Sequence, residues 1–113
     1  MDIEIRKYLY DIQQACQLIE EFINGQDFGS YQSNVMLKSA VERQCITVGE
    51  ALNQVLKRSP ELNSQISDAR QIVDFRNVLT HGYASISDTV VWDILQTKLP
   101  ILSNEVDSLL NPG

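Results

Sequence analysis

The spacing of apolar residues is the feature that most restricts the fold of this chain. Over residues 5–23 the apolar positions recur in alternating steps of four and three residues, which places them in one stripe along a helix. Residues 41–55 repeat the same spacing. Asn24 and Gly25 follow the first stripe and Pro60 follows the second, and these residue types favour the end of a helix. Two long amphipathic helices are therefore expected.

Two further helices are expected in the second half of the chain. The apolar positions predict one over residues 68–80, with Gly82 as its C-terminal residue in the left-handed conformation. Ser87 is expected to cap the other helix, which Pro100 should kink or break. Gly49 lies inside the second long helix, where glycine costs about 1 kcal/mol relative to alanine. We therefore expect another helix to approach closely at Gly49.

Four amphipathic helices with short connections indicate an all-α protein, an antiparallel four-helix bundle that residues 1–113 form as a single domain. A hydrophobic fraction of 43% and a charged fraction of 21% are typical of a soluble globular protein. No apolar run approaches the roughly 20 residues that span a bilayer, so we expect a cytoplasmic protein with no membrane partner. The stripes on the first two helices resemble a coiled-coil seam, which favours a homodimer.

The chain has two cysteines and one histidine, too few for a metal site. We expect Cys16 and Cys45 to be reduced packing residues, and we expect no metal and no cofactor. The net charge of −6 argues against binding of nucleic acid through a broad basic surface. Residues 38–76 are nevertheless mildly basic, with six bases and five acids. Any phosphate contact would be local, through Arg43, Arg70 and Arg76, unless these residues simply belong to a solvated mixed surface.

The only histidine lies in a cluster of polar residues near the end of the third expected helix. Asn77 and His81 are four residues apart and share a helix face, so the amide can orient the imidazole ring. Arg76 lies about 140° away around a regular helix and reaches them only through its long side chain. An imidazole exchanges protons near neutral pH, as acid–base chemistry requires. The alternative is that His81 binds the last carbonyls of its own helix and Arg76 makes a surface ion pair.

The sequence resembles the HepT-like branch of the HEPN superfamily, small helical ribonucleases that are toxins of toxin–antitoxin pairs. Residues 76–83 read R-x-x-x-x-H-x-Y, the pattern of that branch. Residues 42–43 (E-R) and 48–51 (V-G-E-A) resemble the second helix of the family, and residues 91–92 (V-W) and 99–102 (L-P-I-L) resemble its last helix. The R-x4-H pattern is unspecific alone, but together these matches extend over most of the chain.

The resemblance implies a metal-independent endoribonuclease with an RNA substrate. In such an enzyme, His81 and Arg76 from two protomers would meet in a cleft at the two-fold axis of a homodimer. His81 would transfer protons, Arg76 would stabilise the charge on the pentacoordinate phosphate, and Asn77 would orient His81 or bind a phosphate oxygen. The family's partner is a minimal nucleotidyltransferase antitoxin that attaches AMP units to the tyrosine, here Tyr83. Tyr83 could instead pin the turn after Gly82.

Several alternatives stay open on the sequence. Arg43 either binds RNA phosphate or joins an ion-pair network. Glu50 either marks a helix-packing position or pairs with a basic residue near the cleft. Trp92 is expected in the core or in a dimer contact. The chain could also be a non-catalytic helical subunit that binds or regulates a nucleotidyltransferase. A third possibility is a purely structural dimer, favoured if Arg76 and His81 are buried and separated.

Overall fold

The computed structural model describes residues 1–113 except for the side chain of Tyr83. The described chain contains no strand, which confirms the prediction of an all-α protein. Its elements, in chain order, are α1 (Ile3–Ile23), α2 (Phe28–Ser33), α3 (Val35–Arg58), the 3₁₀-helix η1 (Pro60–Ser64), α4 (Ala69–His81), the 3₁₀-helix η2 (Tyr83–Ser85), α5 (Asp88–Thr97) and α6 (Leu99–Leu110).

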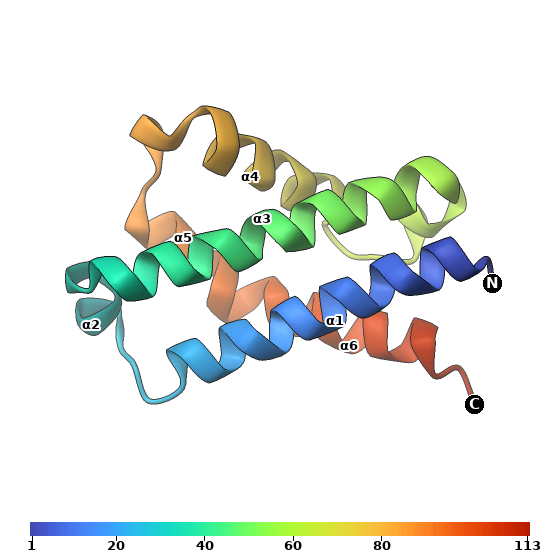
Figure 1. The fold of residues 1–113 in the computed structure, drawn as a ribbon, viewed down its shortest axis with the longest axis horizontal. Helices are drawn as coiled ribbons and strands as arrows, with labels where there is room; N and C mark the ends of the chain where they lie inside the picture. The colour runs from blue at the N-terminus through green and yellow to red at the C-terminus, as the bar shows by residue number, and fades with distance from the viewer.

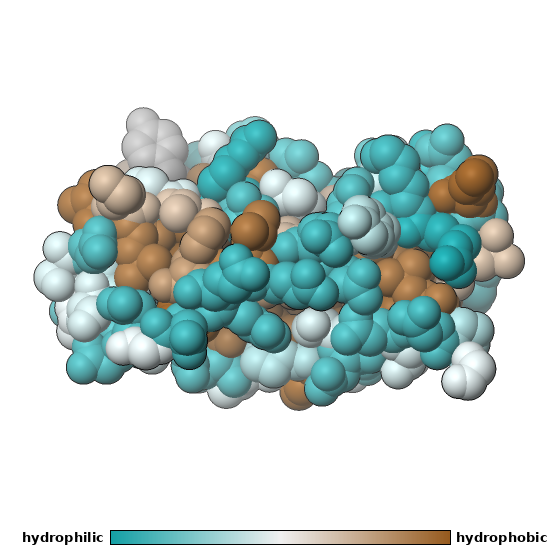
Figure 2. Space-filling model, turned by 60° about the horizontal axis from the view of Figure 1, so that its bottom comes forward, coloured by the Kyte–Doolittle hydropathy of each residue, from teal (hydrophilic) through white to brown (hydrophobic). Residues whose placement is uncertain are grey.

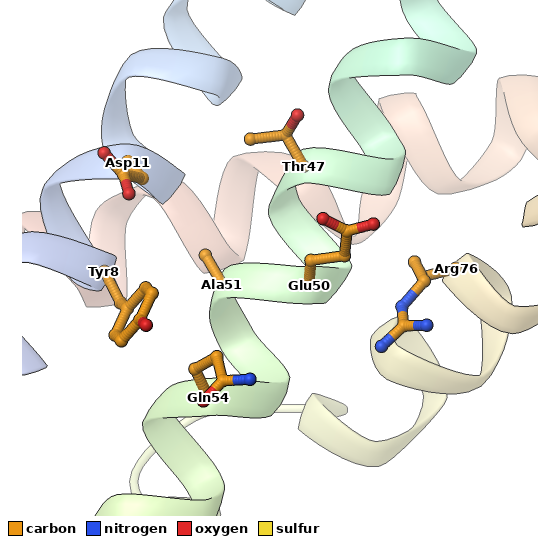
Figure 3. Close-up of a pocket in the computed structure, with 7 residues that line it drawn as sticks. All are labelled: Tyr8, Asp11, Thr47, Glu50, Ala51, Gln54 and Arg76. Carbon is orange, nitrogen blue, oxygen red and sulfur yellow. The ribbon is translucent and has the colours of Figure 1, made fainter.

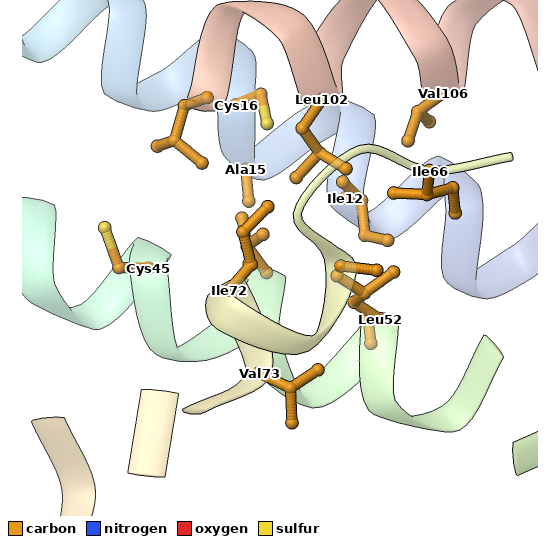
Figure 4. Packing of buried hydrophobic residues seen from close by; sticks show 14 of the residues in the cluster. Ile12, Ala15, Cys16, Cys45, Leu52, Ile66, Ile72, Val73, Leu102 and Val106 are labelled. Atoms are coloured by element: carbon orange, nitrogen blue, oxygen red, sulfur yellow. The ribbon is translucent and has the colours of Figure 1, made fainter. Parts of the chain in front are cut away.

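The helices form a bundle around the long α1–α3 pair. The two helices run in opposite directions, α4 packs on α3, and α6 runs along α1 back toward the end that holds the N-terminus (Figure 1). Buried apolar side chains from α1, α3, α4 and α6 meet in the core, among them Ile12, Leu52, Ile72 and Leu102 (Figure 4). The expected helical bundle is therefore confirmed, with α5 and α6 together supplying its fourth member.

The boundaries of the long helices follow the expected stop signals. The first helix ends at Ile23, and Gly25 takes the left-handed conformation with φ of 77°. The second ends at Arg58, just before Ser59 and Pro60. Pro100 falls in the first turn of α6, so the break predicted there is confirmed. Proline fits this place because the first turn of a helix has no hydrogen-bond partner for the missing N–H.

The expectation for Gly82 was wrong in part. Gly82 does follow the last residue of α4, but its φ of −116° is not left-handed. Its N–H donates to the carbonyl of Val78, and its own carbonyl accepts from Ser85, at 2.8 Å each, so the chain passes directly into η2. At the other end of α4, the N-cap residue Asp68 is left-handed, with φ of 54°. Lys98 binds the Asp68 carboxylate at 2.8 Å and holds this turn.

The short helix α2 was not expected. Asp27 caps it by accepting a hydrogen bond from the N–H of Ser30 at 2.8 Å. The helix buries Tyr31, whose ring centre lies 5.3 Å from that of the partly buried Trp92 on α5. Trp92 therefore packs against the core of the chain, which is one of the two roles expected for it.

Cys16 and Cys45 are buried and unbonded, as expected. Burial raises the pKa of each thiol to about 12, so both stay protonated at neutral pH.

Hydrophilic residues cover the middle of one long face, and hydrophobic residues gather toward its ends (Figure 2). No helix in the described chain has both the length and the apolar character needed to cross a membrane.

Candidate active site

Helix α4 approaches α3 closely at Gly49. A Cβ atom placed on Gly49 would lie 2.2 Å from the Cβ of Arg76 and 2.8 Å from its Cγ, distances that no real side chain tolerates. The expectation that Gly49 admits another helix is therefore confirmed. The helix that it admits is α4, and the residue in contact is the arginine of the R-x4-H pattern.

The side chain of Arg76 enters an open cleft between three helices. The cleft has a volume of about 460 Å³ and is lined by Arg76 from α4, Tyr8 and Asp11 from α1, and Thr47, Glu50, Ala51 and Gln54 from α3. The guanidinium group of Arg76 points toward α3 (Figure 3). Its Nε is buried with no hydrogen-bond partner, and no carboxylate of the described chain lies within 4.0 Å of it. The guanidinium is therefore free to bind an anion from outside.

Charges of both signs surround this cleft. Asp11 pairs with Lys7 at 3.4 Å, one turn earlier on α1. The Nζ of Lys7 and the Cζ of Arg58 lie 5.1 and 5.5 Å from the centre of the Tyr8 ring. Glu50 is exposed and makes no ion pair or side-chain hydrogen bond within the described chain. The cleft thus presents one free guanidinium and one free carboxylate.

His81 and Asn77 lie outside this cleft. Both are exposed on α4, and His81 is the last residue of that helix. On a regular helix His81 stands about 7.5 Å beyond Arg76 and about 140° around the axis. One protomer therefore does not bring the imidazole and the guanidinium into a single cleft. The described chain also lacks the expected Asn77–His81 hydrogen bond. Instead, the hydroxyl of Thr80 donates to the carbonyl of Arg76 at 3.1 Å and to that of Asn77 at 3.2 Å.

The other predicted residues are also distributed over the surface. Arg43 and Arg70 are exposed, and neither lines the cleft. Glu50 does line it, directly after the helix-packing glycine, but it forms no ion pair with a basic residue within the described chain. Tyr83 belongs to η2, but its side chain lies outside the part of the chain that the structure describes. In that described part, no three His, Cys, Asp or Glu side chains gather in a way that could hold a metal ion.

Sequence reasoning missed four residues of the cleft: Tyr8, Asp11, Thr47 and Gln54. A signal for some of them was present. Thr47, Glu50 and Gln54 recur at helical spacing, so they share a polar face of the helix that contains Gly49. Because a second helix must approach at Gly49, the polar residues next to it are candidates for the cleft. The residues from α1 had no such signal, because nothing in the order of residues indicates which side of α1 faces this stripe.

A small apolar groove lies between α4 and the start of α5. Phe75 and Val78 of α4 form it with Ile86, Val90 and Val91 and two serines, and its volume is about 120 Å³. We call it the α4–α5 groove. Val78 is 43% exposed and Val90 is 52% exposed. Val78 precedes His81 by three residues, so the two share one face of α4.

Comparisons with known proteins agree on one family. The family model described as "Ribonuclease HepT-like" matches residues 12–109. The chain is 27% identical over 104 residues to a protein of Methanocaldococcus jannaschii named "Putative RNase", covering 92% of this chain and 94% of that protein. It is 28% identical over 104 residues to "Probable ribonuclease HepT" of Thermococcus cleftensis, again covering 92% and 94%. No solved structure matches significantly. Because the family model spans nearly all of its residues, this chain belongs to the HepT-like ribonuclease family.

Proposed function

We propose that this protein is a metal-independent endoribonuclease and the toxin of a toxin–antitoxin pair. The observation that supports this best is the Arg76 guanidinium, which enters an open cleft without a protein partner on the same helix as the only histidine. A forked guanidinium binds a phosphate through two parallel hydrogen bonds. Membership in the HepT-like family supports RNA as the source of that phosphate.

The chemistry requires two proton transfers. A base removes the proton of a ribose 2′-hydroxyl, and the oxygen attacks the adjacent phosphorus. The bond from phosphorus to the 5′-oxygen then breaks, an acid protonates the departing oxygen, and one product ends in a 2′,3′-cyclic phosphate. His81 would act as base or acid, and Arg76 would stabilise the extra negative charge of the pentacoordinate phosphate. Asn77 would orient His81 or bind a phosphate oxygen.

A homodimer would supply the second imidazole, since each chain has only one histidine. The exposed position of His81 at the end of α4 supports this proposal, because a second copy can reach the ring from outside. The α4–α5 groove supports it as well, since its apolar Val78 and Val90 adjoin the same surface. Arg43 and Arg70 are exposed cations that would contact flanking RNA phosphates.

Cleavage of RNA in EDTA tests the enzymatic proposal. We expect the parent to give products ending in a cyclic phosphate. His81→Ala and Arg76→Ala should each lower the rate by about 10² to 10⁴, as expected for loss of acid–base catalysis or of charge stabilisation. Helical content measured by circular dichroism should not change. Gln96→Ala alters an exposed residue of α5 and is the matched control. If His81→Ala cuts RNA as fast as the parent, the assignment is wrong.

Tyr83 is proposed as the site of regulation by a minimal nucleotidyltransferase antitoxin. It follows His81 by two residues, so AMP attached there would place bulk and negative charge beside the histidine and compete with RNA phosphate. Mass spectrometry of the chain co-expressed with the antitoxin should find AMP-sized additions on Tyr83. Their absence would remove this part of the proposal.

The second candidate is a non-catalytic helical subunit that binds or regulates the nucleotidyltransferase. The net charge of −6 favours it, because an acidic surface suits a protein partner better than a long RNA. RNA that stays intact after incubation with the purified protein in EDTA would support this candidate over the ribonuclease.

A further inference from the structure

Two of the polar side chains that line the cleft around Arg76, those of Glu50 and Gln54, have no role in the proposed cleavage step. Glu50 and Gln54 lie four residues apart on α3, so they share one face of the helix. Neither side chain makes a hydrogen bond or an ion pair within the described chain. The carboxylate of Glu50 offers two acceptor oxygens, and the amide of Gln54 offers N–H donors. Together they form a free hydrogen-bonding surface beside a free guanidinium.

This set of groups is complementary to guanine. A carboxylate that accepts two parallel hydrogen bonds needs two adjacent donors, and among the four RNA bases only guanine has them, as N1–H and the N2 amino group. The O6 atom beside N1 then accepts from a carboxamide. Uracil has one N–H between two carbonyl oxygens, and adenine and cytosine each place an acceptor nitrogen beside their amino group. A carboxylate repels those acceptors, so Glu50 disfavours the three other bases.

We propose that this cleft is a subsite for one guanine nucleotide of the RNA substrate. Glu50 binds N1–H and the N2 amino group, Gln54 donates to O6, and Arg76 holds the phosphate of the same nucleotide. The volume of about 460 Å³ lies within the range of small-molecule sites. The Watson–Crick edge must be free to reach Glu50, so the substrate is single-stranded there. The inference rests on the proposed function, since that function makes RNA the ligand.

Binding of mononucleotides tests the subsite without requiring cleavage. Guanosine, inosine and uridine 5′-monophosphates are titrated into the parent protein, and amide shifts are followed by NMR. Inosine lacks only the N2 amino group. We expect guanosine monophosphate to bind about fivefold or more tightly than the inosine analogue, with the uridine nucleotide weakest and with shifts at residues 49–54. Glu50→Gln should remove the preference, and Glu21→Gln, an exposed change on α1 outside the cleft, should keep it.

Cleavage of matched oligonucleotides separates this inference from the proposed function. Three single-stranded RNAs differ only in guanosine, inosine or uridine at one position, and kcat/KM should fall in that order for the parent. In Glu50→Gln the value for the guanosine substrate should drop to that for uridine. Equal nucleotide affinities in the parent, or a guanosine preference unchanged in Glu50→Gln, overturn the subsite. Loss of all cleavage by the parent would instead contradict the ribonuclease, while the titration still decides guanine binding.

Discussion

Arg76 owes its position to the absence of a side chain at Gly49. Glycine inside a helix is unfavourable on its own, and here the cost is offset by a contact between α3 and α4 that no other residue permits. The Cβ of Arg76 is fixed to its backbone, so it cannot move away from a larger neighbour unless α4 moves with it. The placement of the guanidinium in the cleft therefore depends on Gly49, a residue that has no side chain of its own.

Gly49→Ala tests this dependence. The added methyl group should lower the free energy of unfolding by about 1 to 3 kcal/mol, measured by chemical denaturation, because it forces α4 away from α3. RNA cleavage should fall as well, since Arg76 moves with its helix. Gly29→Ala is the matched control, because the nearest atom to a Cβ there is Asp27 Oδ1 at 3.5 Å, an ordinary contact. Equal stability of Gly49→Ala and the parent would contradict the close approach.

The environment of Glu42 gives a pH-dependent prediction. Partial burial, and then the nearby Asp88 carboxylate, raise the pKa of Glu42, with Lys38 opposing the shift. The folded state therefore binds this proton more tightly than the unfolded state, so the free energy of unfolding decreases as pH rises above the ordinary carboxyl pKa of about 4.3. The Tm of Glu42→Gln should be higher than that of the parent at pH 7, and this difference should disappear near pH 4. Glu21→Gln, an exposed change on α1, should show no such pattern.

Among the elements, the long periodic helices were predictable and the short ones were not. Stripes with a period near 3.6 residues extend over many turns in α1 and α3, and each helix ends at a Gly or Pro signal. The six-residue α2 is too short to show a period, and it exists because Asp27 caps it and Tyr31 packs inward. The direct passage from Gly82 into η2 depends on local hydrogen bonds that residue type alone does not specify.

The junction between α2 and α3 depends on Asn34. Its side chain accepts a hydrogen bond from the N–H of Leu37 at 3.0 Å, and its own N–H donates to the carbonyl of Tyr31 at 3.3 Å. Asn34→Ala should lower the free energy of unfolding by about 1 kcal/mol, as for other lost N-caps. Asn34→Asp keeps the acceptor and should retain stability. Thermal unfolding followed by circular dichroism measures both, and equal loss in the two variants would argue against capping.

For the whole molecule, the proposed dimer makes the α4–α5 groove an interface. Val78→Glu places a charge in this apolar groove beside His81 and should shift the protein from dimer to monomer in sedimentation experiments, because a buried unpaired charge is costly. RNA cleavage should be lost with the dimer. Gln96→Ala should leave the assembly unchanged. If the parent is itself monomeric, or if Val78→Glu remains dimeric, the groove is not the interface.

Residue order alone was enough to establish the long helices, the need for a close approach at Gly49 and the resemblance to HepT-like ribonucleases, because these depend on local periodicity and short motifs. It did not indicate that Arg76 turns toward Glu50 and Tyr8 and leaves His81 outside on the surface. That arrangement depends on how α1, α3 and α4 cross, and the side chains of the cleft come from positions up to 68 residues apart. Such neighbours meet only through packing, in which the crossing at Gly49 determines where the guanidinium points.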